Sequence, residues 1–305
     1  LQVDTDKDGV NDALDLAPTD PLVGAELQWN STDDSVFGLD SAYRTYEEYS
    51  RVDADISDNT NVITLGIARA YQDSSYKNRG IVSIFEVFNG VRNQSQILEL
   101  PELAKEQYFG KITEVSGDGS TIVASDSANN TNAVSIFNRT NGSWSRQQVI
   151  EFQYSIKSIS ISDNAEVLAV SSYKSAGAEI YKKNLQSGLY TLLQDLKIEN
   201  FGVFDGSIVL SGSGNVLAVS SPKTSQENVN TRGEIYLYRF NEVSQVYEQS
   251  ATIASPAEQS YVSLGYCLDL NYVGDILAIC APDEDVHQLD KFGAVYIYAQ
   301  RQPSE

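Results

Sequence analysis

One short apolar motif recurs five times in this chain, and its repetition limits the possible folds more than any other feature. Each copy follows a turn rich in Ser, Gly, Asn and Asp, and each is short enough to be a strand buried on both faces. The copies are Asn61–Gly66, Ser120–Ser125, Glu166–Ser171, Asn215–Ser220 and Asp275–Cys280. Their spacing of roughly 46 to 60 residues is the period of propeller blades.

Further strands are expected after each copy. An alternating strand follows every apolar run, and a more polar strand comes next in four of the five repeats. The alternating strands are Gly80–Phe85, Ala133–Phe137, Gly177–Tyr181, Gly233–Tyr238 and Gly293–Tyr298. Four short strands per repeat without helical periodicity predict an all-β fold, a β-propeller of five blades, each a four-stranded antiparallel sheet. A truncated ring of six or seven blades is the alternative.

The fifth repeat ends before a polar fourth strand appears. The segment Ala25–Asn30 precedes the first blade and could supply that strand, which would close the ring and remove the sheet edges. We therefore predict two parts, a metal-binding segment over residues 1–24 and the propeller over residues 25–305.

The first residues carry the pattern of a calcium-binding loop. Carboxylates fall at positions 1, 3, 5, 9 and 12 of a twelve-residue window, with a glycine at position 6, where the backbone must turn sharply. These carboxylates belong to Asp4, Asp6, Asp8, Asp12 and Asp15. Carboxylates this close repel one another unless a cation offsets their charge. Calcium is therefore the expected cofactor.

The charge balance narrows the class of partner. The 305 residues contain 21 Lys and Arg against 42 Asp and Glu, a formal net charge of −21. Such a surface repels nucleic acid and anionic lipid, so neither is expected as a partner. No apolar run approaches the 18 or so residues of a membrane span, so no direct membrane insertion is expected. A chain that starts at Leu1 is interpreted as a processed piece.

The reactive residue types argue against catalysis. His287 is the only histidine, which excludes most histidine-based triads and histidine-metal centres. Paired carboxylates of the glycosidase kind remain open, but no acid lies in a segment that predicts a pocket wall. We therefore expect a protein that is not an enzyme.

Two sequence features concern covalent modification. Cys267 and Cys280 flank a predicted hairpin turn, so they are expected on paired strands, either as a disulfide or as two small buried apolar residues. Asn-x-Ser/Thr sequons occur at Asn30, Asn93, Asn129, Asn138 and Asn141. Their number slightly exceeds the number expected by chance. Glycosylation is predicted on condition that the source is eukaryotic.

The repeats resemble FG-GAP repeats, which build the propellers of integrin α-subunits and many surface proteins. The resemblance rests on three matching pieces: Phe109-Gly110 ahead of the turn Ser116–Gly119, Phe201-Gly202 ahead of the run Leu217–Pro222, and Leu264-Gly265 ahead of the run Leu277–Pro282. The acid-rich blade loops of integrins are not matched here, so blade calcium sites are not expected.

The first twenty residues resemble a thrombospondin type-3 repeat, including the proline-rich exit Leu16–Pro21. That resemblance implies calcium ligation by the five aspartates, with the Val10 carbonyl as a further ligand. Together the two resemblances imply an extracellular, secreted calcium-binding protein of adhesion or matrix assembly. Its expected partners are other extracellular proteins or copies of itself. The alternative is a carbohydrate-binding propeller, either a lectin or a glycan-processing enzyme, and its partners would be glycans.

Overall fold

The computed structural model describes strands and turns within one unit, Ala42–Glu305, and contains no helix in the part that it describes. The residues that the structure describes are 52–59, 61–70, 79–88, 91–100, 108–128, 131–173, 175, 177–198, 206–222, 233–256, 262–284 and 293–300.

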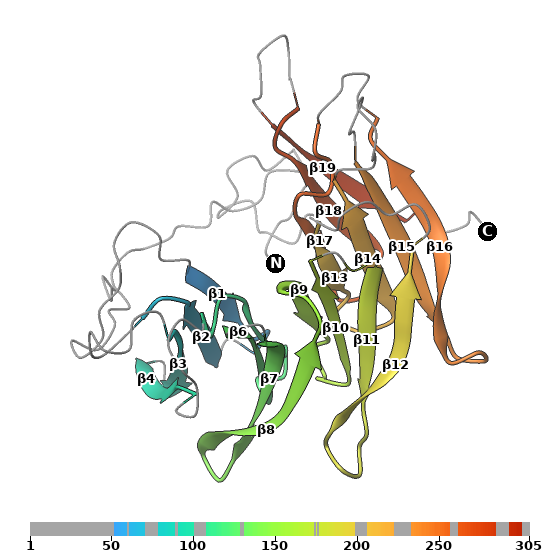
Figure 1. Cartoon of the computed structure of the whole chain (residues 1–305). Helices are drawn as coiled ribbons and strands as arrows, with labels where there is room; N and C mark the ends of the chain where they lie inside the picture. Colours follow the sequence, from blue (N-terminus) through green and yellow to red (C-terminus); the bar gives the residue numbers. More distant parts are fainter. Residues whose placement is uncertain are drawn as a thin grey trace, which may run out of the picture. The chain divides into compact units, whose positions relative to one another are not determined.

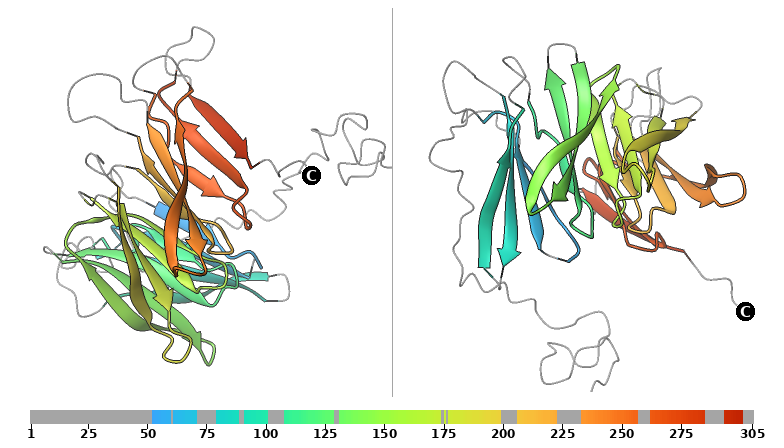
Figure 2. Two further views of the ribbon diagram at one scale, coloured as in Figure 1. Left: turned by 90° about the vertical axis from the view of Figure 1, so that its right-hand side faces the viewer. Right: turned by 90° about the horizontal axis from the view of Figure 1, so that it is seen from below.

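Five antiparallel sheets follow one another along the chain, and each corresponds to one sequence repeat (Figures 1 and 2). Blade 1 holds β1 (Val52–Ile56), β2 (Val62–Ile67), β3 (Ile81–Phe88) and β4 (Val91–Leu98). Blade 2 holds β5 (Thr113–Val115), β6 (Thr121–Ala128), β7 (Thr131–Thr140) and β8 (Ser143–Phe152). Blade 3 holds β9 (Ile156–Ile161), β10 (Val167–Ser172), β11 (Gly177–Lys183) and β12 (Tyr190–Lys197).

Blade 4 holds β13 (Ile208–Leu210), β14 (Val216–Ser221), β15 (Glu234–Asn241) and β16 (Val246–Ala254). Blade 5 contributes β17 (Leu268–Leu270), β18 (Ile276–Ala281) and β19 (Ala294–Ala299). The prediction of an all-β, five-bladed propeller with four-stranded antiparallel blades is confirmed. The segment predicted to complete blade 5, residues 25–30, lies outside the described residues.

The apolar core lies between successive blades. Val134 and Ile136 of blade 2, for example, are at most 1% exposed and pack with Ile159 and Tyr181 of blade 3. The same arrangement recurs between the other consecutive blades. Central strands such as β14 are buried along their whole length, which explains why they read as continuous apolar runs in the sequence.

The turn between the first two strands of a blade is built by local side-chain hydrogen bonds. In four blades it begins with a serine whose Oγ accepts the backbone amide five residues later, at 3.0 to 3.1 Å. These serines are Ser57, Ser116, Ser162 and Ser211. In blade 5, Asn271 takes this place, and its Oδ1 accepts the amides of Gly274, Asp275 and Ile276. A polar residue at this position therefore stabilises the tight turn.

The outer strands of neighbouring blades are joined by a repeated contact that we call the glutamine clamp. The side-chain amide of Gln194 on β12 donates to the carbonyl of Tyr247 on β16 and accepts its backbone amide, at 3.1 and 2.7 Å. The same pair of bonds joins Gln96 to Trp144 and Gln148 to Tyr190. Each clamp seats the aromatic residue of one blade against the blade before it.

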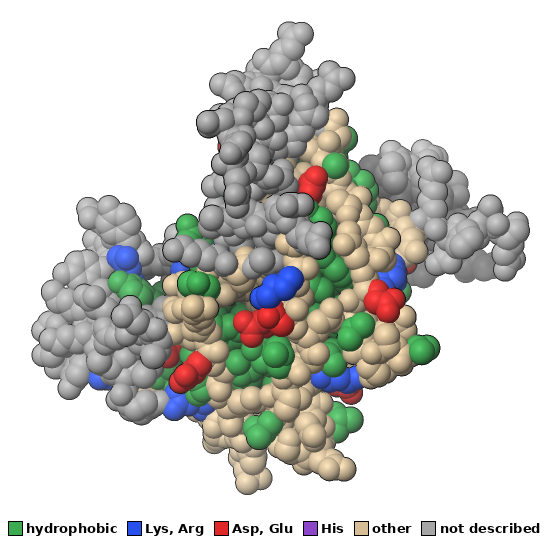
Figure 3. Space-filling model, turned by 45° about the vertical axis from the view of Figure 1, so that its right-hand side comes forward, with side chains coloured by type: hydrophobic (Ala, Val, Ile, Leu, Met, Phe, Trp, Pro, Cys, Tyr) green, Lys and Arg blue, Asp and Glu red, His purple; other side chains and the backbone are tan. Residues whose placement is uncertain are grey.

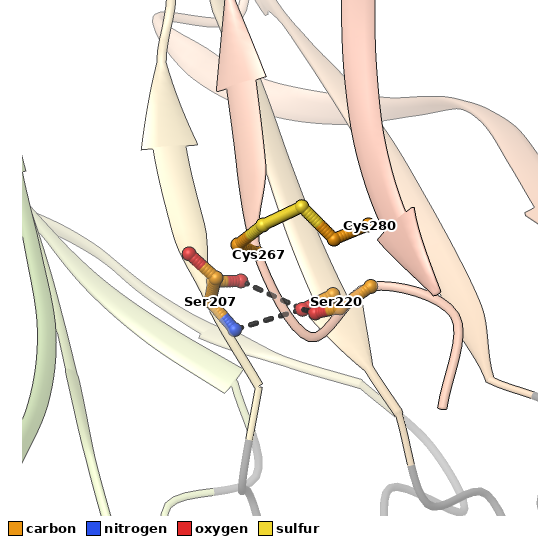
Figure 4. The surroundings of a disulfide bond; sticks show 5 residues. Ser207, Ser220, Cys267 and Cys280 are labelled. Carbon is orange, nitrogen blue, oxygen red and sulfur yellow. Dashed lines mark hydrogen bonds between the residues drawn. A yellow bond between two sulfur atoms is a disulfide. The ribbon is translucent and has the colours of Figure 1, made fainter. Parts of the chain in front are cut away.

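In blade 5 a disulfide joins Cys267, directly before β17, to Cys280 on β18, and their Cα atoms lie 5.2 Å apart (Figure 4). Ser207 and Ser220 occupy the corresponding positions of blade 4, where the Ser220 hydroxyl accepts the Ser207 amide at 2.8 Å. A covalent link in blade 5 thus takes the place of a hydrogen bond in blade 4.

Candidate functional site

A cavity of about 500 Å³ lies among the first strands of the blades. Its wall includes Asp55 and Glu114 of blades 1 and 2, Ser160 of blade 3, Val209 of blade 4 and Asp269 of blade 5. These five residues occupy the same position in their repeats, two residues before the polar residue that starts the turn. The cavity is therefore the centre of the propeller, and one position of the repeat sets much of its chemistry.

Polar side chains on the first strands, Asp55 and Ser160 of the cavity wall among them, connect one blade to the next. Asp53 and Asp55 of β1 accept the backbone amides of Thr113 and Val115 on β5, at 2.8 and 2.7 Å. Ser160 of β9 accepts an amide of β13 in the same way, at 3.0 Å. The first strand of a blade has no partner strand on its inner side, so its amides need other acceptors. The acidic and hydroxyl side chains of the centre supply them.

Acids crowd the blade 1 and blade 2 side of the centre. Burial raises the pKa of Glu114 well above its usual value, and the nearby charges of Asp55 and Asp53 raise it further, while a hydrogen bond from the amide of Ile161 lowers it. Burial also raises the pKa values of Asp53 and Asp55, against the hydrogen bonds from Thr113 and Val115. The centre of the propeller thus disfavours additional negative charge.

At the turn end of the cavity, two further carboxylates lie against each other. A Cβ atom on Gly117 would meet Asp163 at 2.6 Å and the carboxylate of Asp58 at 2.7 Å, and one on Gly212 would meet the Asp163 carboxylate at 2.2 Å. Burial raises the pKa of Asp163 to about 6, with further contributions from a hydrogen bond to Asp58 and from its charge. The Asp58–Asp163 pair therefore holds one proton more readily than two separate aspartates would.

The backbone holds this pair in place. The amide of Asp163 donates to the carbonyl of Gly212 at 2.9 Å, and the amide of Asp118 donates to the carbonyl of Asp163 at 2.8 Å. Similar bonds join Asn59 to Gly117 and Ser213 to Tyr272, so the first turns of all five blades are linked in chain order. The pair is consequently a product of blade packing, with its members in different blades.

Replacing Asp163 with asparagine is expected to stabilise the fold at pH 8 by about 1 kcal/mol, a value reduced for solvent screening because Asp163 is partly exposed. Its folded pKa of about 6 exceeds the ordinary 3.8, so the folded state binds more protons between these values. The pair's contribution to stability is thus present at low pH and lost as the pH rises through about 6, and Asp163→Asn should remove this dependence. Urea unfolding of both proteins at several pH values measures the effect.

Asp118→Asn serves as the matched control for that measurement. The Asp118 carboxylate accepts three hydrogen bonds inside its own turn, from Ser116 and from the amide and hydroxyl of Ser120, at 2.6 to 3.0 Å. Its charge is only the last of the causes that raise the pKa of Asp163, so the loss of these three hydrogen bonds should outweigh the relief, and Asp118→Asn should bring less gain at pH 8 than Asp163→Asn, or a loss. Equal gains from both substitutions would contradict the assignment to the Asp58–Asp163 pair.

The predicted metal ligands lie outside the described residues, since all of them precede β1. They are Asp4, Asp6, Asp8, Val10, Asp12 and Asp15. Within the described ranges, no group of three or more His, Cys, Asp or Glu side chains has the arrangement of a metal site. The calcium loop therefore stays a prediction from the sequence.

The predicted glycosylation sites fall in different surroundings. Asn141 is exposed in the turn between β7 and β8 with a positive φ of 53°, and Asn93 is exposed on β4. Asn138 is half-buried on β7, where its Oδ1 accepts a hydrogen bond from Thr121 at 3.2 Å. Asn30 and Asn129 lie outside the described residues.

Reasoning from the sequence missed the acids of the centre. A usable signal was present, because Asp53 and Asp55 alternate with small or apolar residues directly before the turn serine Ser57. Acids at alternate positions of a strand lie on one face of the sheet, and here that face contacts the backbone of blade 2. Asp58 and Asp163 have no such signal, because they lie in the turns of different repeats.

The outer surface shows no comparable concentration of acids on the face drawn in Figure 3. There, acidic and basic side chains stand singly or in small groups among polar and apolar ones. In the part of the chain that is described, no helix could cross a membrane.

The fold and its polar centre define the class of this protein as a five-bladed β-propeller. No protein-family model matches the sequence, and no curated protein is detectably similar to it. Solved structures match at the level of fold. A protein from Lactobacillus plantarum shares 14% identity at a TM-score of 0.51, with 82% of this chain and 80% of that one covered.

Two other solved structures are similar to the same degree. A putative 6-phosphogluconolactonase from Bacteroides fragilis shares 9% identity at a TM-score of 0.51, over 82% of this chain and 80% of that one. A β-propeller domain from Myceliophteria thermophila shares 11% identity at a TM-score of 0.52, over 84% and 71%. Similarity at these identities extends to the fold and not to activity.

Proposed function

We propose that this protein is an extracellular, calcium-dependent propeller that binds other proteins, or copies of itself, in a surface or matrix assembly. The observation that carries the proposal is the use of the central carboxylates. Asp53 and Asp55 accept backbone amides of blade 2, and Glu114 accepts one of blade 3, so these acids serve to join blades. Carboxylates committed in this way are poorly suited to proton transfer with a substrate.

Two further features support an extracellular binding role. A disulfide within a single blade, between Cys267 and Cys280, is typical of proteins that fold in an oxidising compartment. The FG-GAP and thrombospondin-like sequence features occur in proteins of the cell surface and matrix. The calcium loop would then order the N-terminal segment next to the propeller.

A binding screen tests this function. The labelled full-length chain is applied to an array of purified secreted and cell-surface proteins, with millimolar calcium or with EDTA. We expect saturable binding to a small set of proteins, weakened at least about tenfold by EDTA because the calcium-ordered segment contributes to the contact. Binding that is absent with calcium, or equal with and without it, contradicts the proposal.

One observation favours a second candidate, a carbohydrate-binding or carbohydrate-processing propeller. The Asp163 carboxyl lies against that of Asp58 at the end of a polar cavity, where burial and Asp58 raise its pKa to about 6, and such a carboxyl group can act as a general acid near neutral pH. A glycan array, combined with hydrolysis assays on aryl glycosides, distinguishes this candidate. Turnover that is lost in Asp163→Asn but kept in Asp118→Asn would place it first.

A further inference from the structure

The last strand of blade 5 has an unpaired edge in the described part of the chain. The corresponding strands β3, β7, β11 and β15 each pair with a fourth strand of their own blade, whereas β19 pairs only with β18. The outermost strands of the other blades, β4, β8, β12 and β16, all carry charged residues, while β19 carries none. Charged residues are one means by which edge strands avoid pairing with other chains. The edge of β19 is therefore suited to receive another strand.

The backbone of β19 presents hydrogen-bonding groups along this edge. The amide of Gln300, directly after β19, donates to the carbonyl of Asp275, directly before β18, at 2.7 Å. The two strands pair without a bulge, so successive residues of β19 direct their backbone groups alternately to β18 and to the free edge. The amides and carbonyls of Val295, Ile297 and Ala299 consequently face the free edge.

A cavity of about 270 Å³ accompanies this edge, between blades 4 and 5. Five residues of its wall occupy repeat positions whose counterparts, one blade earlier, pack in a single apolar cluster with the ring of Tyr247. The wall residues are Val216, Leu237, Leu270, Leu277 and Tyr298, and their counterparts are Val167, Ile180, Leu210, Leu217 and Tyr238. The cavity thus has the wall of a filled junction, and blade 5 supplies no fourth strand with a ring for it among the described residues.

At the three preceding junctions, a buried aromatic residue stands at the start of the following blade's fourth strand. These residues are Trp144, Tyr190 and Tyr247, each at most 4% exposed. The Tyr247 hydroxyl donates to the carbonyl of Gly214, the fourth residue of the blade 4 turn, and Tyr190 makes the same bond in blade 3. Gly274 is the fourth residue of the blade 5 turn and lines the cavity. By its position in the repeat, its carbonyl is the acceptor for a tyrosine hydroxyl.

One residue of the cavity wall departs from the repeat. The strand pairing places Ala251 where Gln194 lies in blade 3, so Ala251 occupies the position of the clamp glutamine. Gln194 makes two hydrogen bonds with the backbone of Tyr247, and an alanine side chain can make neither. The junction therefore offers an incoming aromatic residue a packing site and a strand edge, but no clamp.

We propose that this junction binds an extended segment of a partner protein with a tyrosine at its start. The phenol ring fills the cavity, and the residues that follow pair with β19 as a fourth antiparallel strand. The register is that of blade 4, where Tyr247 pairs with Phe240, the counterpart of Gln300. The segment then continues along β19 from Ala299 to Ala294, so about seven residues take part. The proposal goes beyond the calcium-linked function, because neither blade contains the predicted calcium loop.

A peptide with the sequence of the protein's own strand β16, Val246–Ala254, is a suitable probe, because it has a tyrosine near its start. Fluorescence polarisation of the labelled, end-capped peptide with the full-length chain should show saturable binding in calcium and in EDTA alike. This result can stand or fail independently of the calcium-dependent screen. Replacing the peptide's tyrosine with alanine should weaken binding at least about tenfold, the effect of truncating a buried aromatic anchor. No saturable binding, or equal binding of both peptides, overturns the proposal.

Restoring the clamp assigns the binding to this junction. Ala251→Gln should tighten binding of the tyrosine peptide about fivefold, because it supplies the two hydrogen bonds that Gln194 makes in blade 3. Thr252→Gln, on the same strand but outside the cavity wall, should leave the affinity unchanged. N-acetyltyrosinamide, which has the ring without a strand, should bind at least about tenfold more weakly than the peptide. Equal affinity for the two ligands overturns the proposal, as does a folded Ala251→Gln protein that binds no more tightly than Thr252→Gln.

A second pair of variants tests the strand edge. Ile297→Pro removes an amide that faces the free edge and should weaken peptide binding at least about tenfold. Ile297→Ala keeps that amide and should stay within about threefold of the unaltered protein. Circular dichroism confirms that both variants are folded. Equal affinities of the two folded variants overturn the proposal. Dimers that light scattering detects in the unaltered chain and that Ile297→Pro converts to monomers also overturn it, in favour of a second copy at this edge.

Discussion

Replacing Tyr247 with alanine is expected to lower the free energy of unfolding by about 3 to 5 kcal/mol, the range for large aromatic side chains removed from a core. Tyr247 is 2% exposed and packs among Ile180, Leu196 and Tyr238, with its ring 5.3 Å from that of Phe240. The substitution opens a cavity between blades 3 and 4 and leaves the buried carbonyl of Gly214 without its donor. Urea unfolding measured by circular dichroism gives the value.

Two variants separate the contributions of the ring and the hydroxyl. Tyr247→Phe keeps the ring and removes only the hydrogen bond, so about 1 kcal/mol should be lost. Tyr266→Ala removes a tyrosine that is 65% exposed and should change stability by less than about 0.5 kcal/mol. If Tyr247→Ala and Tyr266→Ala lower the free energy of unfolding equally, the buried aromatic side chains do not hold the blades together.

Removing two carboxylates from the predicted calcium loop is expected to weaken calcium binding on the order of 100-fold, because affinity follows the number of charged ligands. The change is Asp4→Asn with Asp8→Asn, at positions 1 and 5 of the loop. Isothermal titration of the full chain with calcium chloride should give one site in the unaltered protein. Chelation should leave the unfolding midpoint of the propeller nearly unchanged, since the ion stabilises only the segment that binds it.

A variant of equal charge tests whether the effect is specific. Glu242→Gln with Glu248→Gln removes two exposed carboxylates from the β15–β16 hairpin and should leave calcium affinity within about twofold. An unaltered chain that binds no calcium at millimolar concentration would exclude the loop. If both double variants lose calcium affinity equally, calcium binding depends only on the net charge of −21 and not on the loop.

The repeats were predictable because their signals are local. A serine that starts a turn, such as Ser162, accepts the amide of a residue only five positions later. An unbroken apolar run such as that of β14 indicates a strand that is buried on both faces. The opposition of Cys267 and Cys280 also followed from a short turn, since strands joined by a hairpin have a defined register. Blade number and strand order then follow from counting repeats.

The candidate site was less predictable because its contacts join different repeats. Asp58 and Asp163 are ordinary turn residues when each repeat is read alone, and only blade packing brings their carboxylates together across Gly117. The Gln194–Tyr247 clamp spans 53 residues, and no pattern within either strand indicates it.

The amino-acid sequence by itself thus determined the blades, their turns and their number, because the strands and turns of a blade are stabilised by interactions within one repeat. The tertiary structure alone decided which acids lie around the central cavity and that the carboxylates of Asp58 and Asp163 lie against each other. The physical reason is that pKa shifts and cavities depend on neighbours in space. Those neighbours come from separate repeats that meet only when the blades pack against one another.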